Sequence, residues 1–175
     1  MPPFSCPVSP SLVDVAEIRA WGRVGNDRLE LIDLAIDSLL HGGEGDDELI
    51  GSDGADLIFG GLGNDHLTGA AGNDFLIGGS GADWIAGSAD HEILVAGDVA
   101  EDFIDEALRL ILAHWVDDRV PDAELEDGVL DETLGDDGFD MLTGSSGSDW
   151  FIISDDDKVT DLKKKNNDGD LVTIL

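Results

Sequence analysis

The sequence predicts a mostly β protein built from repeated coils, and three observations lead to this. A nine-residue motif repeats without interruption through the middle of the chain. Glycine is abundant, at 23 of 175 residues, and the formal net charge is −31. A fixed short period is typical of solenoids, in which each unit buries its apolar side chains against the next unit.

Six consecutive nine-residue units run from Gly42 to Val95. The first position is glycine in all six units. The fourth is glycine in five, with Asp90 as the exception, and the sixth is aspartate in five, with Glu92 in the last unit. The eighth position is always a large aliphatic residue: Leu49, Ile58, Leu67, Leu76, Ile85 and Leu94.

Each position of the motif has a physical role. Glycine in a turn adopts positive φ and lets neighbouring main chains approach closely. The residues around the eighth position form a short strand, with the eighth side chain inward and its neighbours outward. The aspartate places a hard carboxylate oxygen in the turn, and calcium takes six to eight oxygens from carboxylates and backbone carbonyls.

These units resemble the RTX (hemolysin-type) calcium-binding repeats of secreted bacterial proteins. The resemblance implies a right-handed parallel β-roll, in which two units make one coil and calcium lies between turns one coil apart. The turns at 42–47, 60–65 and 78–83 would form one row, which we call row A. The turns at 51–56, 69–74 and 87–92 would form the other row, row B.

The resemblance implies about three to five calcium ions. They would lie between neighbouring turns of row A and between 51–56 and 69–74 in row B. A further site between 69–74 and 87–92 is disfavoured, because Asp90 and Glu92 depart from the motif there. The residues expected to hold calcium are Gly42, Gly43, Gly45, Asp47, Gly51, Gly54, Asp56, Gly60, Gly61, Gly63, Asp65, Gly69, Gly72, Asp74, Gly78, Gly79, Gly81, Asp83, Glu92, Asp140 and Asp149.

Stacked carboxylates oppose folding unless a cation lies between them. Two charges one strand spacing apart, ~4.8 Å, repel by about 3.5 kcal/mol at an effective dielectric constant of ~20. We therefore expect a chain that is largely unfolded without calcium and that orders at the ~0.1–1 mM typical of extracellular modules.

Four regions are expected along the chain. Residues 1–20 form an irregular segment, and 21–95 form the roll, including a capping coil without metal at Gly22–Glu30. Residues 96–134 form an insertion with an acidic loop and a helix near 99–118, where apolar residues recur at helical spacing. Its apolar stripe is expected to pack on its own domain, with a protein partner as the alternative.

Residues 135–175 hold two further units, Gly135–Thr143 and Gly144–Ile152, followed by two capping strands. If the insertion loops out, these units continue both rows. Asp140 would then lie near Asp83, and Asp149 near Glu92.

Several function classes are disfavoured. The acidic surface repels nucleic acid, and no stretch has the ~18–20 apolar residues of a membrane span. Cys6 is alone, so neither an intrachain disulfide nor a thiolate metal site is expected. The dipeptide His91-Glu92 lacks the second histidine of a zinc-protease motif. No catalytic constellation is apparent, so the chain is not expected to be an enzyme.

The favoured function is calcium binding coupled to folding in a secreted, extracellular or cell-surface protein. One alternative is the C-terminal secretion and folding module of a larger hydrolase. Others are a structural or adhesive extracellular protein and a plain acidic disordered chain. The start of the chain has no signal-peptide pattern, whereas its acidic and apolar end resembles an uncleaved type I secretion signal, so the type I secretion machinery is an expected partner.

Overall fold

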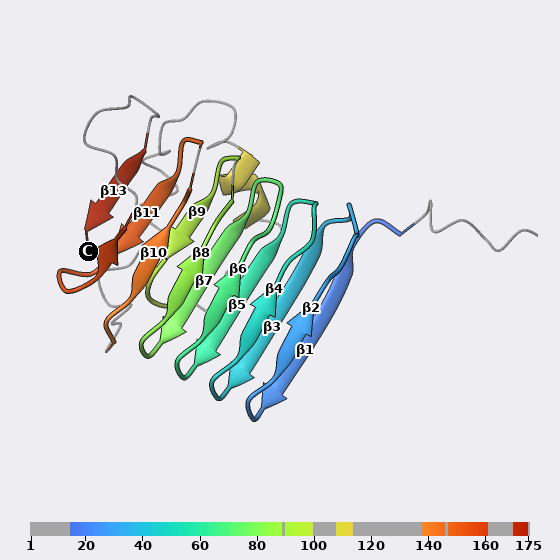
Figure 1. Ribbon diagram of the computed structural model, residues 1–175, viewed down its shortest axis with the longest axis horizontal. Coiled ribbons are helices and arrows are strands. Elements are labelled where there is room, and N and C mark those ends of the chain that lie inside the picture. The colour runs from blue at the N-terminus through green and yellow to red at the C-terminus, as the bar shows by residue number, and fades with distance from the viewer. Residues whose placement is uncertain are drawn as a thin grey trace, which may run out of the picture.

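The computed structural model describes residues 15–88, 90–99, 108–113, 138–145, 147–160 and 170–174. These residues form a β-solenoid of two parallel sheets, with one short helix on its side (Figure 1). Each coil contributes one strand to each sheet. The mostly β, parallel fold predicted from the repeat is confirmed.

The first sheet has seven strands, in the order β1-β3-β5-β7-β9-β11-β13, and the second has six, in the order β12-β10-β8-β6-β4-β2. The strands of the first sheet are β1 (Ile18–Val24), β3 (Ser38–Glu44), β5 (Leu57–Leu62), β7 (Phe75–Ser80), β9 (Ile93–Val95), β11 (Trp150–Ile153) and β13 (Leu171–Ile174). The strands of the second sheet are β2 (Arg28–Glu30), β4 (Glu48–Ile50), β6 (His66–Thr68), β8 (Trp84–Ala86), β10 (Met141–Thr143) and β12 (Lys158–Val159).

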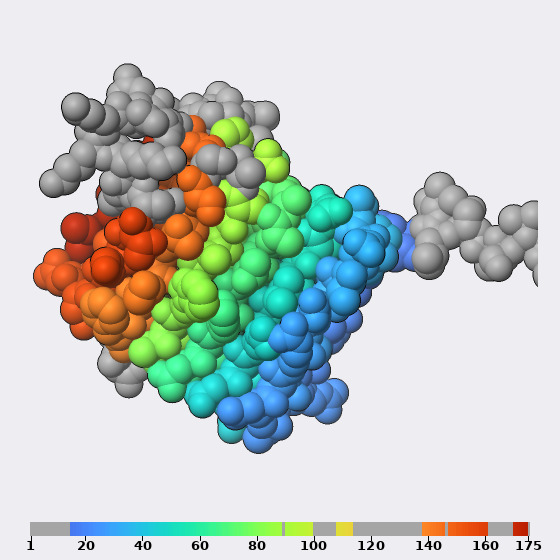
Figure 2. All heavy atoms as spheres, in the orientation of Figure 1, coloured from blue at the N-terminus to red at the C-terminus, as the bar shows by residue number. Residues whose placement is uncertain are grey.

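The interior is filled by the eighth-position side chains, stacked in line from coil to coil. Ile58 pairs with Leu76 in the first sheet, and Leu49 pairs with Leu67 in the second. All six predicted inward residues are fully buried, at 0% exposure. A shift of one residue would turn every one of them to the solvent, so the apolar pattern fixes the register. Successive coils appear as parallel bands of colour in Figure 2.

The helix described within the insertion packs on the outside of the first sheet. It covers residues 108–113, within the predicted range of 99–118; Val99 lies outside the helix, and residues 100–107 and 114–118 lie outside the described residues. The helix buries Leu108, Ile111 and Leu112 against apolar residues of the sheet. These are outward, seventh-position residues, among them Leu57, Phe75, Ile93 and Trp150.

Composition explains why the helix lies on this face. The seventh position is apolar in the first sheet from β3 onward, whereas in the second sheet it includes polar residues such as Glu48 and His66. The helix therefore covers an outward stripe of the first sheet that is apolar from coil to coil. Among those residues no helix has the length and apolarity that crossing a membrane requires.

The two units after the insertion continue both sheets. β10 pairs with β8, so that Met141 lies opposite Trp84, and β11 pairs with β9, so that Trp150 lies opposite Ile93. The insertion therefore leaves the stack of coils unbroken. Pairing of β12 with β10 and of β13 with β11 adds the strand pair predicted near the end of the chain.

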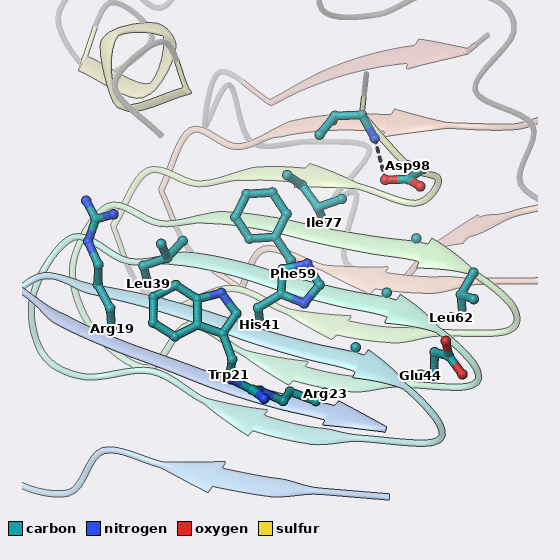
Figure 3. A pocket seen from close by; sticks show the side chains of 14 residues that line it. Arg19, Trp21, Arg23, Leu39, His41, Glu44, Phe59, Leu62, Ile77 and Asp98 are labelled. Carbon is teal, nitrogen blue, oxygen red and sulfur yellow. Dashed lines mark hydrogen bonds between the residues drawn. The ribbon is translucent and has the colours of Figure 1, made fainter. Parts of the chain in front are cut away.

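A shallow groove lies on the outer face of the first sheet, near its N-terminal edge. Trp21, His41 and Phe59 lie side by side along it (Figure 3), with the rings of His41 and Phe59 stacked at 5.7 Å. Second-position glycines, including Gly61, line it as well. It is a consequence of the repeat, because ninth-position rings and second-position glycines each align from coil to coil.

Replacing Leu67 by alanine tests the packing of the interior. Leu67 is fully buried in β6 between β4 and β8, so the cavity is expected to lower the free energy of unfolding of the calcium-saturated protein by about 2–5 kcal/mol. Urea unfolding followed by circular dichroism measures it. The neighbouring half-buried Thr68→Ala serves as control and is expected to cost less than about 1 kcal/mol. Equal losses for both variants would contradict the assigned register.

Candidate metal sites

Each first-position glycine is required because the aspartate of its own unit folds back against it. A Cβ placed on Gly42, Gly60 or Gly78 would meet Oδ2 of the aspartate five residues later at less than 3.0 Å. The same Cβ would also meet a carbonyl oxygen of the next coil; for Gly60 this is the carbonyl of Gly78. Glycine therefore leaves a small space between coils that is bordered by a carboxylate oxygen and a carbonyl oxygen.

The aspartates of row A form a continuous ladder. The backbone N–H of each one donates to Oδ1 of the aspartate in the next coil. The donor–acceptor distances are 2.7 Å for Asp27 to Asp47, 2.8 Å for Asp47 to Asp65, 2.7 Å for Asp65 to Asp83, 2.6 Å for Asp83 to Asp140 and 2.9 Å for Asp140 to Asp157. The structure thus places Asp140 beside Asp83, as the sequence predicts.

Row B forms a less regular ladder. Ser38 N–H donates to Asp56 at 2.7 Å, and Asp56 N–H donates to Asp74 at 3.0 Å. The described residues show no equivalent bond from Asp74 to Glu92, whose longer side chain accepts the hydroxyl of Ser88 instead, at 3.2 Å. Beyond this irregular unit the ladder resumes, in two bonds of 3.2 Å: from Glu92 to Asp149 and from Asp149 to Asp170.

Most of these carboxylates keep one buried oxygen that accepts no hydrogen bond. Oδ2 of Asp27, Asp47, Asp65 and Asp74 is shielded from solvent and has no hydrogen-bond donor among the described residues. A buried polar atom without a partner is costly, and a buried carboxylate even more so. A cation between the coils would remove this cost.

Backbone carbonyls supply further oxygens beside the carboxylates. Gly25, Gly45 and Gly63 have φ between 116° and 126°, and their carbonyls point at the glycine of the next coil. No backbone hydrogen bond from another described residue reaches these three oxygens. A hard cation such as calcium prefers this donor set of one carboxylate per turn and several carbonyls.

The donors do not form a side-chain cluster. In the part of the chain that the structure describes, no three His, Cys, Asp or Glu side chains gather closely enough to hold a metal ion. This excludes, for those residues, the compact sites in which side chains alone bind zinc. Any ion in these turns has to be held largely by main-chain oxygens.

In the absence of a metal ion, burial raises the pKa of several carboxyl groups in rows A and B. It raises the pKa of Asp65 to about 6 and, with added repulsion from Asp56, that of Asp74 to about 8. Burial also raises the pKa of Asp47 and Asp56. For Glu92, burial and the neighbouring Asp149 carboxylate together raise the pKa to about 9.

A second column of side chains at the fifth position holds the turns in register. Asn64 N–H donates to the Asp46 carboxylate at 2.9 Å, and Ala82 N–H donates to the Asn64 side chain at 3.0 Å. The backbone and side-chain hydrogen bonds from Asn64 lower the pKa of Asp46. Asn26 accepts from Asp46 N–H in the same way, at 3.2 Å. The sequence analysis did not single out this position, although Asn or Asp recurs there.

Sequence reasoning also missed three members of the ladders. Asp27 lies in the coil that was expected only to cap the roll, and its spacing to Asp47 is 20 residues rather than 18. Asp157 and Asp170 precede β12 and β13 and accept the N–H groups of Asp140 and Asp149. An aspartate directly before a short apolar strand is the signal that could have identified both.

The predicted glycines fall into two groups. Row A has positive-φ glycine at both the second and fourth positions, as at Gly43, Gly45, Gly61, Gly63, Gly79 and Gly81. In row B only Gly72 and Gly147 have this conformation at the fourth position, and Gly54 does not. Ala70 and Ser145 adopt positive φ at the second position, although they are not glycines. The two rows therefore have different backbones.

Taken together, these features define a parallel β-solenoid whose acidic, glycine-rich turns stack in two rows and present carboxylate and carbonyl oxygens between coils. The family model of the RTX calcium-binding nonapeptide repeat matches the chain in four copies, over residues 37–67, 68–99 and 134–152. The protein belongs to the family of RTX calcium-binding repeat proteins. Comparisons with curated proteins and with solved structures found no match.

Membership of this family has general consequences. RTX repeats bind calcium, and their β-roll is a structural calcium-binding fold rather than a catalytic one. Proteins with these repeats are typically secreted.

The metal-free chain is expected to be more folded at about pH 5 than at about pH 8. A carboxyl whose pKa is raised in the folded state stabilises that state while protonated. Its contribution is complete below the ordinary value of 3.8 and is lost as the pH rises through about 6 for Asp65 and about 8 for Asp74. Circular dichroism after removal of all divalent ions measures this. An equal or larger β signal at the higher pH would contradict it.

Replacing Gly60 by alanine is expected to raise the calcium concentration at half-folding about tenfold or more, a loss of at least ~1.4 kcal/mol. The new Cβ would collide with Asp65 Oδ2 and the carbonyl of Gly78. Calcium titration followed by circular dichroism measures the shift. As control, Ala70→Gly should not raise that concentration, since Ala70 has a φ of 82° that glycine adopts readily. A Gly60→Ala variant that titrates like the unaltered protein would show that this space is not needed.

Proposed function

We propose that this protein binds calcium between stacked turns, that the ion is required for folding, and that the protein works outside the cell. The observation that carries this proposal is the buried Oδ2 of Asp47 and of Asp65, for which the described residues offer no hydrogen-bond donor. Both residues are only 3% exposed, so these oxygens are shielded from bulk solvent.

The best-supported sites lie in row A. One ion would lie between 42–47 and 60–65, a second between 60–65 and 78–83, and a third where Asp83 meets Asp140. The first two gaps combine an aspartate with carbonyls of stacked, positive-φ glycines, and in the third the carbonyl of the positive-φ Gly81 lies against Gly138. Since Asp27 Oδ2 is also buried and Gly25 repeats the same turn, we extend the proposal to a fourth gap between 22–27 and 42–47.

Row B is proposed as the weaker row. Asp74 has an oxygen without a donor, facing the unit in which Asp90 and Glu92 replace the usual glycine and aspartate. Glu92 and Asp149 are both buried and are linked through a backbone N–H, so this part of the row could hold an ion only if both carboxyls ionise.

Coupling to folding follows from the electrostatics of the ladders. Calcium removes the penalty of the buried carboxylates only when the turns are stacked, because its ligands come from two coils. Calcium at the ~0.1–1 mM that suits such extracellular modules would thus favour folding outside the cell. Secretion in a poorly folded state is part of this proposal.

A calcium titration of the whole chain tests the proposal. Circular dichroism should show a gain of β signal with a midpoint at about 0.1–1 mM calcium. Magnesium at the same concentration is the control and should produce little change, because it demands a small octahedral site and keeps its water. A spectrum that is already folded in chelator, or that never gains β signal, would refute the coupling of folding to calcium.

A further inference from the structure

The turn at 51–56 differs from the turns at 42–47 and 60–65 of row A because both oxygens of its carboxylate accept hydrogen bonds. Asp56 Oδ2 accepts the backbone N–H of Ser52 at 2.6 Å. Oδ1 accepts the N–H of Ser38 at 2.7 Å and the hydroxyl of Ser52 at 3.2 Å. Asp65, at the same place in row A, accepts the N–H of Asp47 at Oδ1, at 2.8 Å, and its Oδ2 has no hydrogen-bond donor among the described residues.

Ser52 makes this difference. It occupies the second position, where row A has positive-φ glycine, but it does not adopt positive φ itself. Its N–H is therefore directed at the carboxylate of its own turn. Its single hydroxyl hydrogen is shared between Asp56 Oδ1 and the carbonyl of Ile36, the latter at 2.7 Å, and its oxygen accepts the N–H of Gly54, at 2.9 Å. The side chain and the backbone of Ser52 thus provide hydrogen bonds inside the turn, including those to the Asp56 carboxylate.

A positive charge already lies on this turn. Arg109, on the inserted helix, donates to the carbonyl of Ala55 at 3.1 Å and to the carbonyl of Ser38 at 3.1 Å. These two residues flank the carboxylate of Asp56: Ala55 precedes it in the chain, and Ser38 donates to it. The guanidinium also forms an ion pair with Glu17. The Arg109 guanidinium therefore binds three oxygen atoms that come from three separate segments of the chain.

We propose that Arg109 is a built-in cation that takes the place of calcium at the turn 51–56, so that this turn is held without metal. The inference rests on the proposed function, since it divides the turns into those that take calcium and one that does not. It revises the sequence-based expectation of an ion between 51–56 and 69–74. The donor set does not fit calcium there, because N–H and O–H donors already occupy the carboxylate.

The position of Arg109 gives this substitution a consequence for folding. Solenoid coils normally contact only their neighbours. Arg109 lies in the insertion that follows β9, yet it binds residues of the first two coils, including Glu17 ahead of β1. The helix can make these contacts only after the intervening strands have formed. Arg109 therefore links the insertion, which follows the sixth unit, to the first coils of the stack and should sharpen the calcium-induced folding transition.

Counting bound calcium in matched variants of the whole chain tests the inference. Asp65→Asn removes a proposed calcium ligand, and Asp56→Asn makes the same change in the closed turn. At saturating calcium, isothermal titration calorimetry should give at least one ion fewer for Asp65→Asn and the unaltered number for Asp56→Asn. If Asp56→Asn also loses an ion, the inference is overturned while the proposed function stands. Absence of calcium binding by the unaltered protein would overturn the proposed function itself.

Variants of Arg109 provide a second measurement that does not depend on the folding of Asp56→Asn. Arg109→Gln should bind as many ions as the unaltered protein, but it should need more calcium to fold and should fold over a broader range of calcium concentration. Arg109→Lys keeps the charge and should recover part of both losses. Loss of one bound ion in Arg109→Gln would mean that Arg109 supports a calcium site rather than replacing one. An unchanged midpoint and an unchanged steepness would equally overturn the inference.

Discussion

The structure depends on one repeated interaction, in which a buried aspartate holds the backbone N–H of the preceding coil. In row A this bond recurs from Asp27 to Asp157 at 2.6–2.9 Å. It fixes the distance between coils and the register of the second sheet, since each strand of that sheet starts directly after such an aspartate. It also buries one carboxylate per coil, and that burial creates the need for a cation. The same aspartate therefore both orders the coils and introduces the charge repulsion between them.

The two rows solve this electrostatic problem in different ways. At Asp47 and Asp65, row A leaves one carboxylate oxygen without a donor among the described residues and places it near carbonyls of positive-φ glycines, an arrangement that suits an ion from solution. At its start, row B replaces glycine by Ser52 and receives a guanidinium from Arg109. Row A would thus bind calcium, whereas the first turn of row B would be held together by the protein's own side chains.

The sequence determined a large part of this protein. A nine-residue period is local information, so it was sufficient to predict the solenoid, the six fully buried eighth-position residues and the membership of each turn in row A or row B. It also predicted that Asp140 would lie beside Asp83 across the insertion, because the motif resumes in phase. The apolar spacing near 99–118 indicated a helix and a self-packing face, which Leu108, Ile111 and Leu112 provide. These features follow from side-chain type and spacing alone.

Only the tertiary structure decided at which turns a carboxylate oxygen is left without a hydrogen-bond donor. Asp56 and Asp65 have the same place in the motif, and the difference between them arises from the φ of Ser52 and from an arginine 54 residues away from Ala55. Asp27 joined the ladder despite its irregular spacing, because the longer first coil still brings its N–H to Asp47. Contacts between residues distant in the chain leave no local pattern. The repeat therefore fixed the scaffold, and folding selected the turns that remain open to a metal ion.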